Sequence, residues 1–285
     1  MCVAADTVGS VYDRYRAELS PIHGASEARA MARIVFNSVL GWDLAELEAR
    51  RSEQLSGSEV LKVIAPLARL RNGEPLQYVL GHCWFMGLRL RVVPGVLIPR
   101  PETEEMVDHI VSTNREFHRI LDVGTGSGCI ALALKKRLPN ALVVGIDVSD
   151  EALAIARDNG GTLGLSVQWI EQDVFDPGGT WPQHLDLVVS NPPYIPFSEH
   201  DSLDAHVRQY EPHLALFVGD ADPLLFYRVI GQRAKEALVE GGALWFETHH
   251  HHAVDVGELL IAMGFHDVAV LQDLSGSARF IRCRR

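Results

Sequence analysis

The chain reads Ile120-Leu121-Asp122-Val123-Gly124-Thr125-Gly126-Ser127-Gly128 where an apolar strand is expected to end and a helix to begin. Glycines lack a Cβ, so they let the backbone turn tightly and approach a ligand closely. The helix expected over residues 130–137 offers free backbone N–H groups at its first turn. This stretch therefore predicts a strand, a ligand-binding turn and a helix, the opening unit of an α/β sheet.

Strand-like and helical segments alternate on both sides of this turn. The strand segments are short and apolar, whereas the helical segments carry apolar residues at a spacing of three to four. This alternation predicts right-handed βαβ crossovers and an α/β fold with a Rossmann-like, doubly wound sheet. Strands are expected over residues 120–123, 141–146, 167–170, 186–189, 243–247, 267–272 and 279–283, and helices over residues 104–112, 130–137, 151–159, 223–237 and 254–263.

The first quarter of the chain has a different pattern. Apolar positions recur at helical spacing in residues 28–40 and again in residues 60–70. After them, short strand-like pieces alternate with glycine and proline, which predicts a β-hairpin. We expect a helical domain over residues 1–74, a hairpin linker over residues 75–99 and a Rossmann-like catalytic domain over residues 100–285.

Composition and charge restrict the kind of partner. The chain has 285 residues, of which 47% are hydrophobic and 22% charged, as in an ordinary globular protein of about two domains. Its formal net charge of −11 argues against direct binding of nucleic acid, which relies on clustered Lys and Arg. No apolar stretch reaches the roughly 18 residues of a membrane span, and no secretory signal is evident. We expect a cytoplasmic monomer that does not contact membranes.

The glycine spacing distinguishes two kinds of cofactor. The pattern is Gly-x-Gly-x-Gly, whereas proteins that bind a dinucleotide pyrophosphate carry Gly-x-Gly-x-x-Gly. The carboxylate of Asp122 would repel a pyrophosphate and attract a sulfonium. Asp147 ends the next strand, where a ribose is usually received, and Asp173 suits the adenine amino group. These residues favour S-adenosyl-L-methionine over a nicotinamide dinucleotide. The expected cofactor-binding residues are Asp122, Gly124, Thr125, Gly126, Ser127, Gly128, Asp147, Asp173, Val174 and Asn191.

The tetrapeptide Asn191-Pro192-Pro193-Tyr194 follows the apolar strand expected at residues 186–189. Proline has no N–H and a fixed φ, so the carbonyls around the two prolines have few local partners and point in set directions. Asn191 adds a side-chain carbonyl oxygen, and Tyr194 adds an aromatic face. Taken alone, the tetrapeptide is consistent with an ordinary loop or with a clamp for a planar NH2 group. The neighbouring cofactor turn favours the clamp.

An NH2 clamp would work by alignment. The nitrogen of a planar NH2 group is a poor nucleophile because its lone pair is delocalised into the group that carries it. If Asn191 Oδ1 and the Pro192 carbonyl each accept one hydrogen, the nitrogen is held toward the methyl donor and its developing positive charge is stabilised. The expected catalytic residues are therefore Asn191, Pro192 and Tyr194, the last of which would wall the site.

Several segments together resemble the HemK-type protein-glutamine N5-methyltransferases, which act on peptide-chain release factors. Asn-Pro-Pro-Tyr is shared with DNA amino-methyltransferases, so it is not specific by itself. The segments at residues 73–78 and 96–104 are more specific. The resembling segments are Gly73-Glu74-Pro75-Leu76-Gln77-Tyr78, Val96-Leu97-Ile98-Pro99-Arg100-Pro101-Glu102-Thr103-Glu104, the turn 122–128, Asn191-Pro192-Pro193-Tyr194 and Tyr210-Glu211-Pro212.

The resemblance implies methylation of the N5 amide nitrogen of the glutamine in the Gly-Gly-Gln loop of class 1 release factors, with S-adenosyl-L-homocysteine as the other product. It also implies an N-terminal helical domain that helps to dock the release factor. The substrate-binding residues expected on this basis are Asn191, Pro192, Pro193, Tyr194, Phe85 and Arg100.

The histidine run departs from the resemblance, which leads us to expect a glycine two residues after Glu247. The chain instead continues as Thr248-His249-His250-His251-His252. Adjacent residues cannot all face one ion, so a solvent-facing loop is favoured and no metal is expected. Cys2, Cys83, Cys129 and Cys283 form no Cys-x-x-Cys pair and are expected to be reduced thiols.

Two other functions compete with this interpretation. An adenine-N6 or cytosine-N4 amino group of DNA would present a similar planar NH2, but it requires a base-flipping surface with basic and aromatic residues. A module that only binds S-adenosylmethionine would explain the glycine turn and would leave Asn-Pro-Pro-Tyr without a role.

Overall fold

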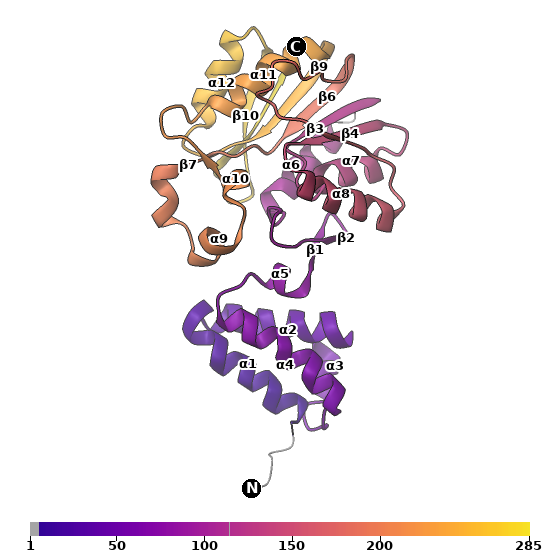
Figure 1. Ribbon diagram of the computed structural model, residues 1–285, viewed down its shortest axis with the longest axis vertical. Helices are drawn as coiled ribbons and strands as arrows, with labels where there is room; N and C mark the ends of the chain where they lie inside the picture. The colour runs from indigo at the N-terminus through magenta and orange to yellow at the C-terminus, as the bar shows by residue number, and fades with distance from the viewer. Residues whose placement is uncertain (1–5, 114) are drawn as a thin grey trace. The chain divides into compact units, whose positions relative to one another are not determined.

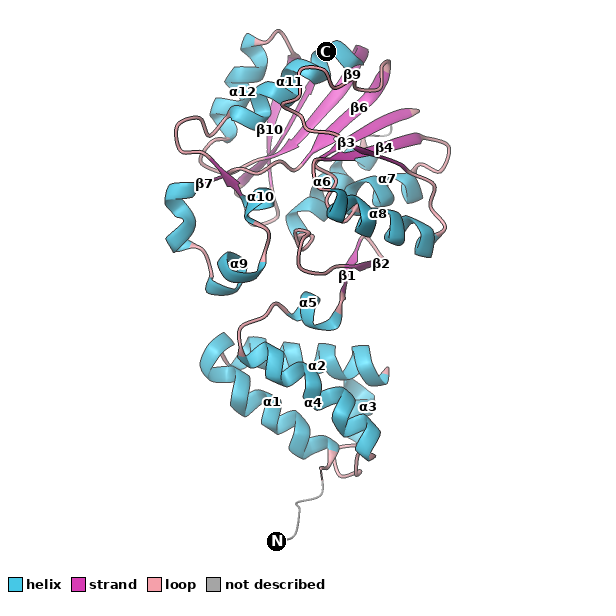
Figure 2. Ribbon diagram, in the orientation of Figure 1, coloured by secondary structure: helices cyan, strands magenta, loops and turns pink. Residues whose placement is uncertain are grey.

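The segments expected after residue 103 form a seven-stranded sheet in a computed structural model of the chain, which describes residues 6–113 and 115–285. The strand order is β10-β11-β9-β6-β3-β4-β5, and Figure 2 shows the strands in magenta between layers of helices. The strands are β3 (Arg119–Val123), β4 (Leu142–Asp147), β5 (Gln168–Glu171), β6 (Leu185–Ser190), β9 (Leu238–Glu247), β10 (His266–Gln272) and β11 (Ala278–Arg284).

The five strands from β5 to β9 run parallel, and β11 pairs antiparallel with both β9 and β10. The chain moves outward from β3 to β4 and β5, then returns to add β6 on the other side of β3. This reversal is the topological switch point at which doubly wound sheets bind ligands. The doubly wound α/β fold expected from the alternating segments is confirmed.

Helices cover both faces of the sheet (Figure 1). One face buries apolar side chains of α6 (Pro101–Ser112), α7 (Cys129–Arg137) and α8 (Asp150–Leu163). The other buries side chains of α11 (Leu225–Ala237) and α12 (Ala253–Ala262). Because parallel strands are buried on both faces, their sequences are almost continuously apolar.

The hairpin predicted before the sheet consists of β1 (His82–Phe85) and β2 (Leu88–Arg91). Its inward side chains join the core beside α7 and α8. Asn159 of α8 fixes it there, because its amide accepts from Arg91 N (2.7 Å) and donates to the carbonyls of Arg91 (3.1 Å) and Ser127 (2.9 Å). The hairpin is thus hydrogen-bonded to the helix that follows β4.

A separate helical unit contains residues up to Gly81 together with Ala205–Tyr210. Two of its helices begin at capping boxes, where Asp43 pairs with Glu46 and Ser56 pairs with Glu59. Its core includes the edge-to-face contact of Tyr15 with Phe36. The helices are α1 (Val8–His23), α2 (Ala25–Leu40), α3 (Leu44–Ala49), α4 (Gly57–Arg71), α5 (Leu76–Leu80) and α9 (Ala205–Tyr210).

The segment after Tyr194 contains elements that the pattern analysis does not predict. They are very short, so they carry no recognisable periodicity. The unpredicted elements are β7 (Ile195–Pro196), η1 (Phe197–Ser202), α9, α10 (His213–Leu216) and β8 (Phe217–Val218).

Two expectations concern the whole chain. None of the described helices is both long and apolar enough to cross a bilayer. Cys83, Cys129 and Cys283 are free thiols, and Cys2 lies outside the described residues.

Candidate functional site

A cavity of about 380 Å³ opens at the carboxyl ends of β3, β4 and β6, beside the switch point of the sheet. This volume is in the range of small-molecule sites. The wall is largely apolar and carries three acidic residues, Asp147, Glu151 and Asp173. It includes Val96, Leu97, Gly124, Gly126, Asp147, Val148, Asp173, Val174, Phe175, Asn191, Pro192, Pro193, Leu214 and Phe226.

The glycine turn forms the floor of the cavity. Gly124 and Gly126 have φ values of 71° and 56°, and a Cβ built on either would meet no atom within 4 Å. A side chain at these positions would therefore project into open space at the cavity wall. The absence of side chains leaves the backbone accessible to a ligand, as the sequence predicts.

Asp147 links the ends of β3 and β4. Its carboxylate accepts from Gly126 N (2.8 Å) and from Ser149 N (3.0 Å). Burial raises the pKa of Asp147 above its usual value, and the two backbone N–H groups act in the opposite direction. Asp147 and the turn thus share one wall of the cavity.

Asp122 lies behind the turn, and it is not part of the cavity wall. Its side chain is fully buried, and Oδ2 accepts from Thr125 Oγ1 (2.6 Å) and Ala131 N (3.1 Å). Oδ1 has no hydrogen-bond partner among the described residues. Asp122 therefore stabilises the conformation of the turn. The sequence suggests that its carboxylate faces a sulfonium directly, but the side chain does not reach the cavity wall. Thr125, Ser127 and Gly128 likewise lie outside the cavity wall.

The buried Asp122 predicts a pH dependence of stability. Burial raises its pKa from 3.8 to about 7, while the hydrogen bonds from Thr125 and Ala131 oppose this shift. The folded state therefore holds the proton more tightly than the unfolded state. The resulting stabilisation is complete below the unfolded pKa and is lost as the pH rises through about 7.

We expect Asp122→Asn to reduce this dependence, because the asparagine keeps an acceptor for Thr125 and Ala131 and cannot ionise. Between pH 5 and pH 8, the free energy of unfolding should fall on the order of 2–3 kcal/mol less in the variant than in the parent. Urea unfolding of both proteins at the two pH values measures this difference. If the free energy of unfolding changed equally in the two proteins between pH 5 and pH 8, Asp122 would not titrate in this range.

The loop after β6 places Asn191, Pro192 and Pro193 in the cavity wall and leaves Tyr194 outside it. The end of β6 is tied to β3 because Ser190 Oγ donates to the Val123 carbonyl (2.7 Å). Asn191 Nδ2 donates to Thr103 Oγ1 (3.3 Å). The structure therefore brings the amide of Asn191 and the glycine turn to one cavity.

Glu247 connects this loop to the neighbouring strand β9. Its buried carboxylate accepts from Thr103 Oγ1 (2.7 Å) and from the Tyr194 hydroxyl (3.2 Å). Burial raises the pKa of Glu247, whereas the hydrogen bonds from Thr103 and Tyr194 and the charge of Arg279 lower it. The sequence pattern gives no sign of this contact, because Glu247 only ends an expected strand and Thr103 is only one residue of the segment 96–104.

The far end of the cavity is apolar. Asp173 Oδ1 accepts from Phe175 N (2.8 Å), which shapes the turn after β5. Phe175 packs edge to face on Phe226 of α11, with ring centroids 5.1 Å apart. Val148 completes this wall. Of these residues, the sequence predicts only Asp173 and its neighbour Val174, because an apolar wall residue cannot be told from a core residue in sequence.

Besides Tyr194, two further residues expected to bind the substrate, Phe85 and Arg100, lie outside the cavity wall. Phe85 is 1% exposed and belongs to the core beneath the hairpin. Arg100 pairs with the buried Glu211, which also accepts from Ile98 N (3.1 Å). Neither side chain belongs to the cavity wall. The Arg100–Glu211 pair instead joins the segments on either side of the cavity that contain Leu97 and Pro212.

The histidine run is only partly exposed to solvent. His249 is 8% exposed and lies 3.4 Å from Glu199, whereas His250 and His251 are exposed. The first histidine thus differs from the solvent-facing loop that the sequence suggests. Within the described residues, no group of three or more metal-ligating side chains is found.

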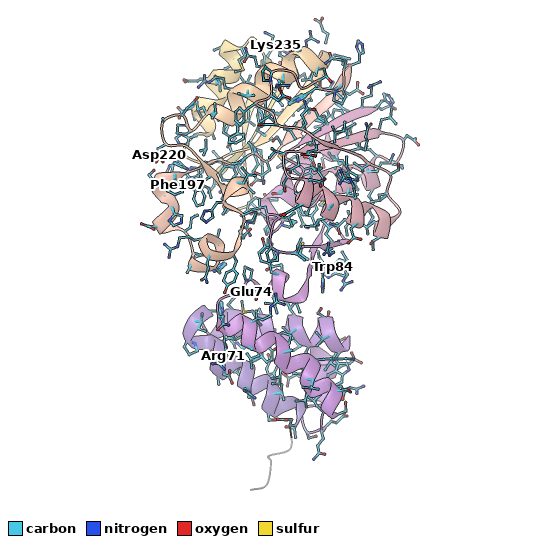
Figure 3. All side chains as sticks on the ribbon, viewed as in Figure 1. Arg71, Glu74, Trp84, Phe197, Asp220 and Lys235 are labelled. Carbon is cyan, nitrogen blue, oxygen red and sulfur yellow. The ribbon has the colours of Figure 1, made fainter. Side chains whose placement is uncertain are left out.

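The short elements after Tyr194 contain an aromatic cluster of Phe197, His200 and Phe217. Phe197 and the nearby Asp220 are labelled in Figure 3. Phe197 stacks on His200 and packs edge to face on Phe217, and Asp220 accepts from Ser198 N (2.8 Å). These contacts order the segment that follows Asn-Pro-Pro-Tyr.

The cavity fits a nucleoside that carries a cationic tail. The backbone is open over Gly124 and Gly126, the carboxylates of Asp147 and Asp173 lie in the wall, and the far end is apolar. These features suit the ribose, the adenine and the sulfonium of S-adenosylmethionine.

Two family models match the chain: the PrmC N-terminal domain over residues 12–81 and the Methyltransferase small domain over residues 102–209. The release factor glutamine methyltransferase of Bacteroides thetaiotaomicron is 41% identical over 270 residues, covering 95% of this chain and 97% of that protein. That of Geobacter sulfurreducens is 39% identical over 275 residues, covering 96% and 95%.

Solved structures share the fold. A methyltransferase from Pyrococcus furiosus gives a TM-score of 0.52 at 20% identity, over 70% of this chain and 89% of that one. The 16S rRNA N2 G1207 methyltransferase of T. thermophilus, in complex with AdoMet and guanosine, also gives 0.52, at 18% identity over 72% of this chain and 49% of that one.

Proposed function

The chain belongs to the release factor glutamine methyltransferase family, and we propose that it methylates the glutamine of the Gly-Gly-Gln loop of class 1 peptide-chain release factors. The methyl group comes from S-adenosyl-L-methionine and goes to the N5 amide nitrogen. One structural observation carries this proposal: the amide of Asn191 is held by Thr103 at the wall of a cavity floored by the glycine turn.

The cavity residues hold the methyl donor. Gly124 and Gly126 expose their backbone to its amino-acid tail, Asp147 receives the ribose hydroxyls, and Asp173 with Val174 receives the adenine. Bound S-adenosylmethionine supplies an electrophilic methyl group on a sulfonium. Phe175 and Phe226 exclude water from the adenine end of the cavity.

The loop after β6 aligns the substrate amide. Asn191 Oδ1 and the Pro192 carbonyl accept the two amide hydrogens, so the nitrogen is held in one orientation. Such alignment supplies on the order of 7–11 kcal/mol in favourable cases. The same two oxygens stabilise the positive charge that develops on the nitrogen, so they matter most in the transition state. After transfer the nitrogen is cationic and acidic, so it loses one of its two protons to solvent, and no strong base is needed.

The helical unit docks the release factor. Residues 12–81 match the PrmC N-terminal domain model, and this unit has its own core and capped helices. A separately folded unit can bind the body of a large protein substrate while the cavity receives a single side chain.

Labelled methyl transfer tests the proposal. The purified chain is incubated with methyl-labelled S-adenosylmethionine and either a class 1 release factor, the same factor with its Gly-Gly-Gln glutamine replaced by alanine, or duplex DNA. Label is expected only in the unaltered factor, and mass spectrometry of its peptides should place one methyl group on the glutamine. Label in the alanine variant or in DNA would overturn the proposal and, in the second case, support the nucleobase alternative.

A further inference from the structure

Thr103 lies in the first turn of α6, where its hydroxyl accepts from the amide of Asn191, and the proposed chemistry gives it no role beyond this contact. We propose that Thr103 is a positioning residue which, held by Glu247, sets which end of the Asn191 amide faces the substrate. This inference rests on the proposed function, because it concerns the same clamp.

The argument starts at Glu247. Its side chain is 1% exposed, and one carboxylate oxygen accepts from Thr103 while the other accepts from Tyr194. The backbone carbonyl of Glu247 accepts from the Tyr227 hydroxyl (3.3 Å). The carboxylate is therefore fixed in place from several directions.

Arg279 supports the negative charge of this carboxylate. Its guanidinium donates to the carbonyl of Thr248 (3.3 Å), the residue after Glu247, and pairs with Asp273 at 3.2 Å. Burial raises the pKa of Glu247, and the charge of Arg279 opposes this shift. The hydroxyls of Thr103 and Tyr194 both donate to the carboxylate, one to each oxygen.

The hydroxyl of Thr103 therefore donates to Glu247 and accepts from Asn191. Its single hydrogen is committed to Glu247 over 2.7 Å, so only its lone pairs remain for Asn191. The partner that Asn191 presents at 3.3 Å must then be its NH2 group. No hydrogen bond to Asn191 Oδ1 is found among the described residues, so this oxygen stays available.

The opposite orientation would disable the clamp. If Asn191 were turned over, its NH2 group would face the NH2 of the substrate, and two donors would meet. The asparagine side chain is nearly symmetric in shape, so packing alone discriminates poorly between the two orientations. The hydrogen bond from Glu247 through Thr103 supplies the discrimination.

Three variants distinguish an effect on the orientation of the Asn191 amide from a general effect on the packing of α6. Thr103→Val keeps the shape and loses the hydroxyl, whereas Thr103→Ser keeps the hydroxyl. Thr113→Val is the matched control, because Thr113 ends the same helix and its hydroxyl donates to the Ile110 carbonyl (2.7 Å). We expect Thr103→Val to lower kcat for release factor about ten- to hundredfold, with an unchanged Kd for S-adenosylhomocysteine. Thr103→Ser should restore most of kcat, and Thr113→Val should match the parent.

A double variant tests whether Thr103 acts through Asn191. In an Asn191→Ala background, Thr103→Val should cause no further loss, because the orientation it controls no longer exists. An additive loss would overturn the proposal. So would a Thr103→Ser variant as slow as Thr103→Val, because the methyl group of Thr103 would then be what matters.

A measurement without substrate separates failure of this inference from failure of the proposed function. In protein labelled with 15N-asparagine, the side-chain NH2 signal of Asn191 is identified by its loss in Asn191→Ala. Its hydrogen exchange should accelerate at least about fivefold in Thr103→Val, since one lost hydrogen bond is worth about 1 kcal/mol or more, and should stay near the parent rate in Thr103→Ser. Unchanged exchange in Thr103→Val would overturn the inference even if the release factor is methylated.

Discussion

Asn191→Ala should lower kcat for methylation of the release factor by about 10²–10³, the usual effect of removing one preorganised polar contact from an active site. The variant loses the side-chain acceptor at the clamp and keeps the Pro192 carbonyl. Because the glycine turn and Asp147 are untouched, the Kd for S-adenosylhomocysteine should change by less than about threefold. Single-turnover kinetics and calorimetry measure the two quantities.

Asn140→Ala is a suitable control for this experiment. Asn140 is exposed and lies in the turn between α7 and β4, at the opposite end of β4 from the cavity. It should match the parent in both kcat and Kd. If Asn191→Ala retained activity within a few-fold of the parent, Asn191 would not be the amide acceptor.

Gly126→Val should lower affinity for S-adenosylhomocysteine by about 5- to 150-fold, since overpacking of a fitted site costs about 1–3 kcal/mol. The new side chain would project from the floor into the open space of the cavity. A φ of 56° would add backbone strain and lower the free energy of unfolding by about 1–2 kcal/mol.

Gly164→Val separates strain from occlusion. Gly164 caps the end of α8 with a φ of 64°, and a Cβ there also meets no atom within 4 Å, but it is not part of the cavity wall. It should show a similar loss of stability in urea and an unchanged Kd. Equal losses of affinity in the two variants would show that backbone strain, and not a valine side chain that fills the cavity, weakens binding.

The sheet was predictable because its signals are local. The strands and helices after residue 103 follow from apolar spacing, and the turn at residues 124–128 follows from its glycines. The elements between residues 195 and 218 were missed because they are two to six residues long. Their conformation depends on contacts such as that of Phe197 with Phe217.

The roles of single side chains within a motif were harder to predict. Asp122 and Phe85 both belong to segments that mark the site, and both turn out to be buried away from the cavity wall. A motif shows that a segment is near the ligand, and it does not show which way each side chain points. That direction is set by packing against α7 for Asp122 and by the hairpin core for Phe85.

Residue order alone thus establishes the doubly wound sheet, the glycine turn and the Asn-Pro-Pro-Tyr loop, since turn chemistry and periodicity act between near neighbours in the chain. The orientation of the Asn191 amide is decided only in the folded protein. Thr103 is 88 residues from Asn191 and 144 from Glu247, and the hydrogen bonds that join them exist only once α6, β6 and β9 have packed together. Hydrogen bonds over such separations leave no periodic signal, because each depends on a single pair of side chains meeting in a buried site.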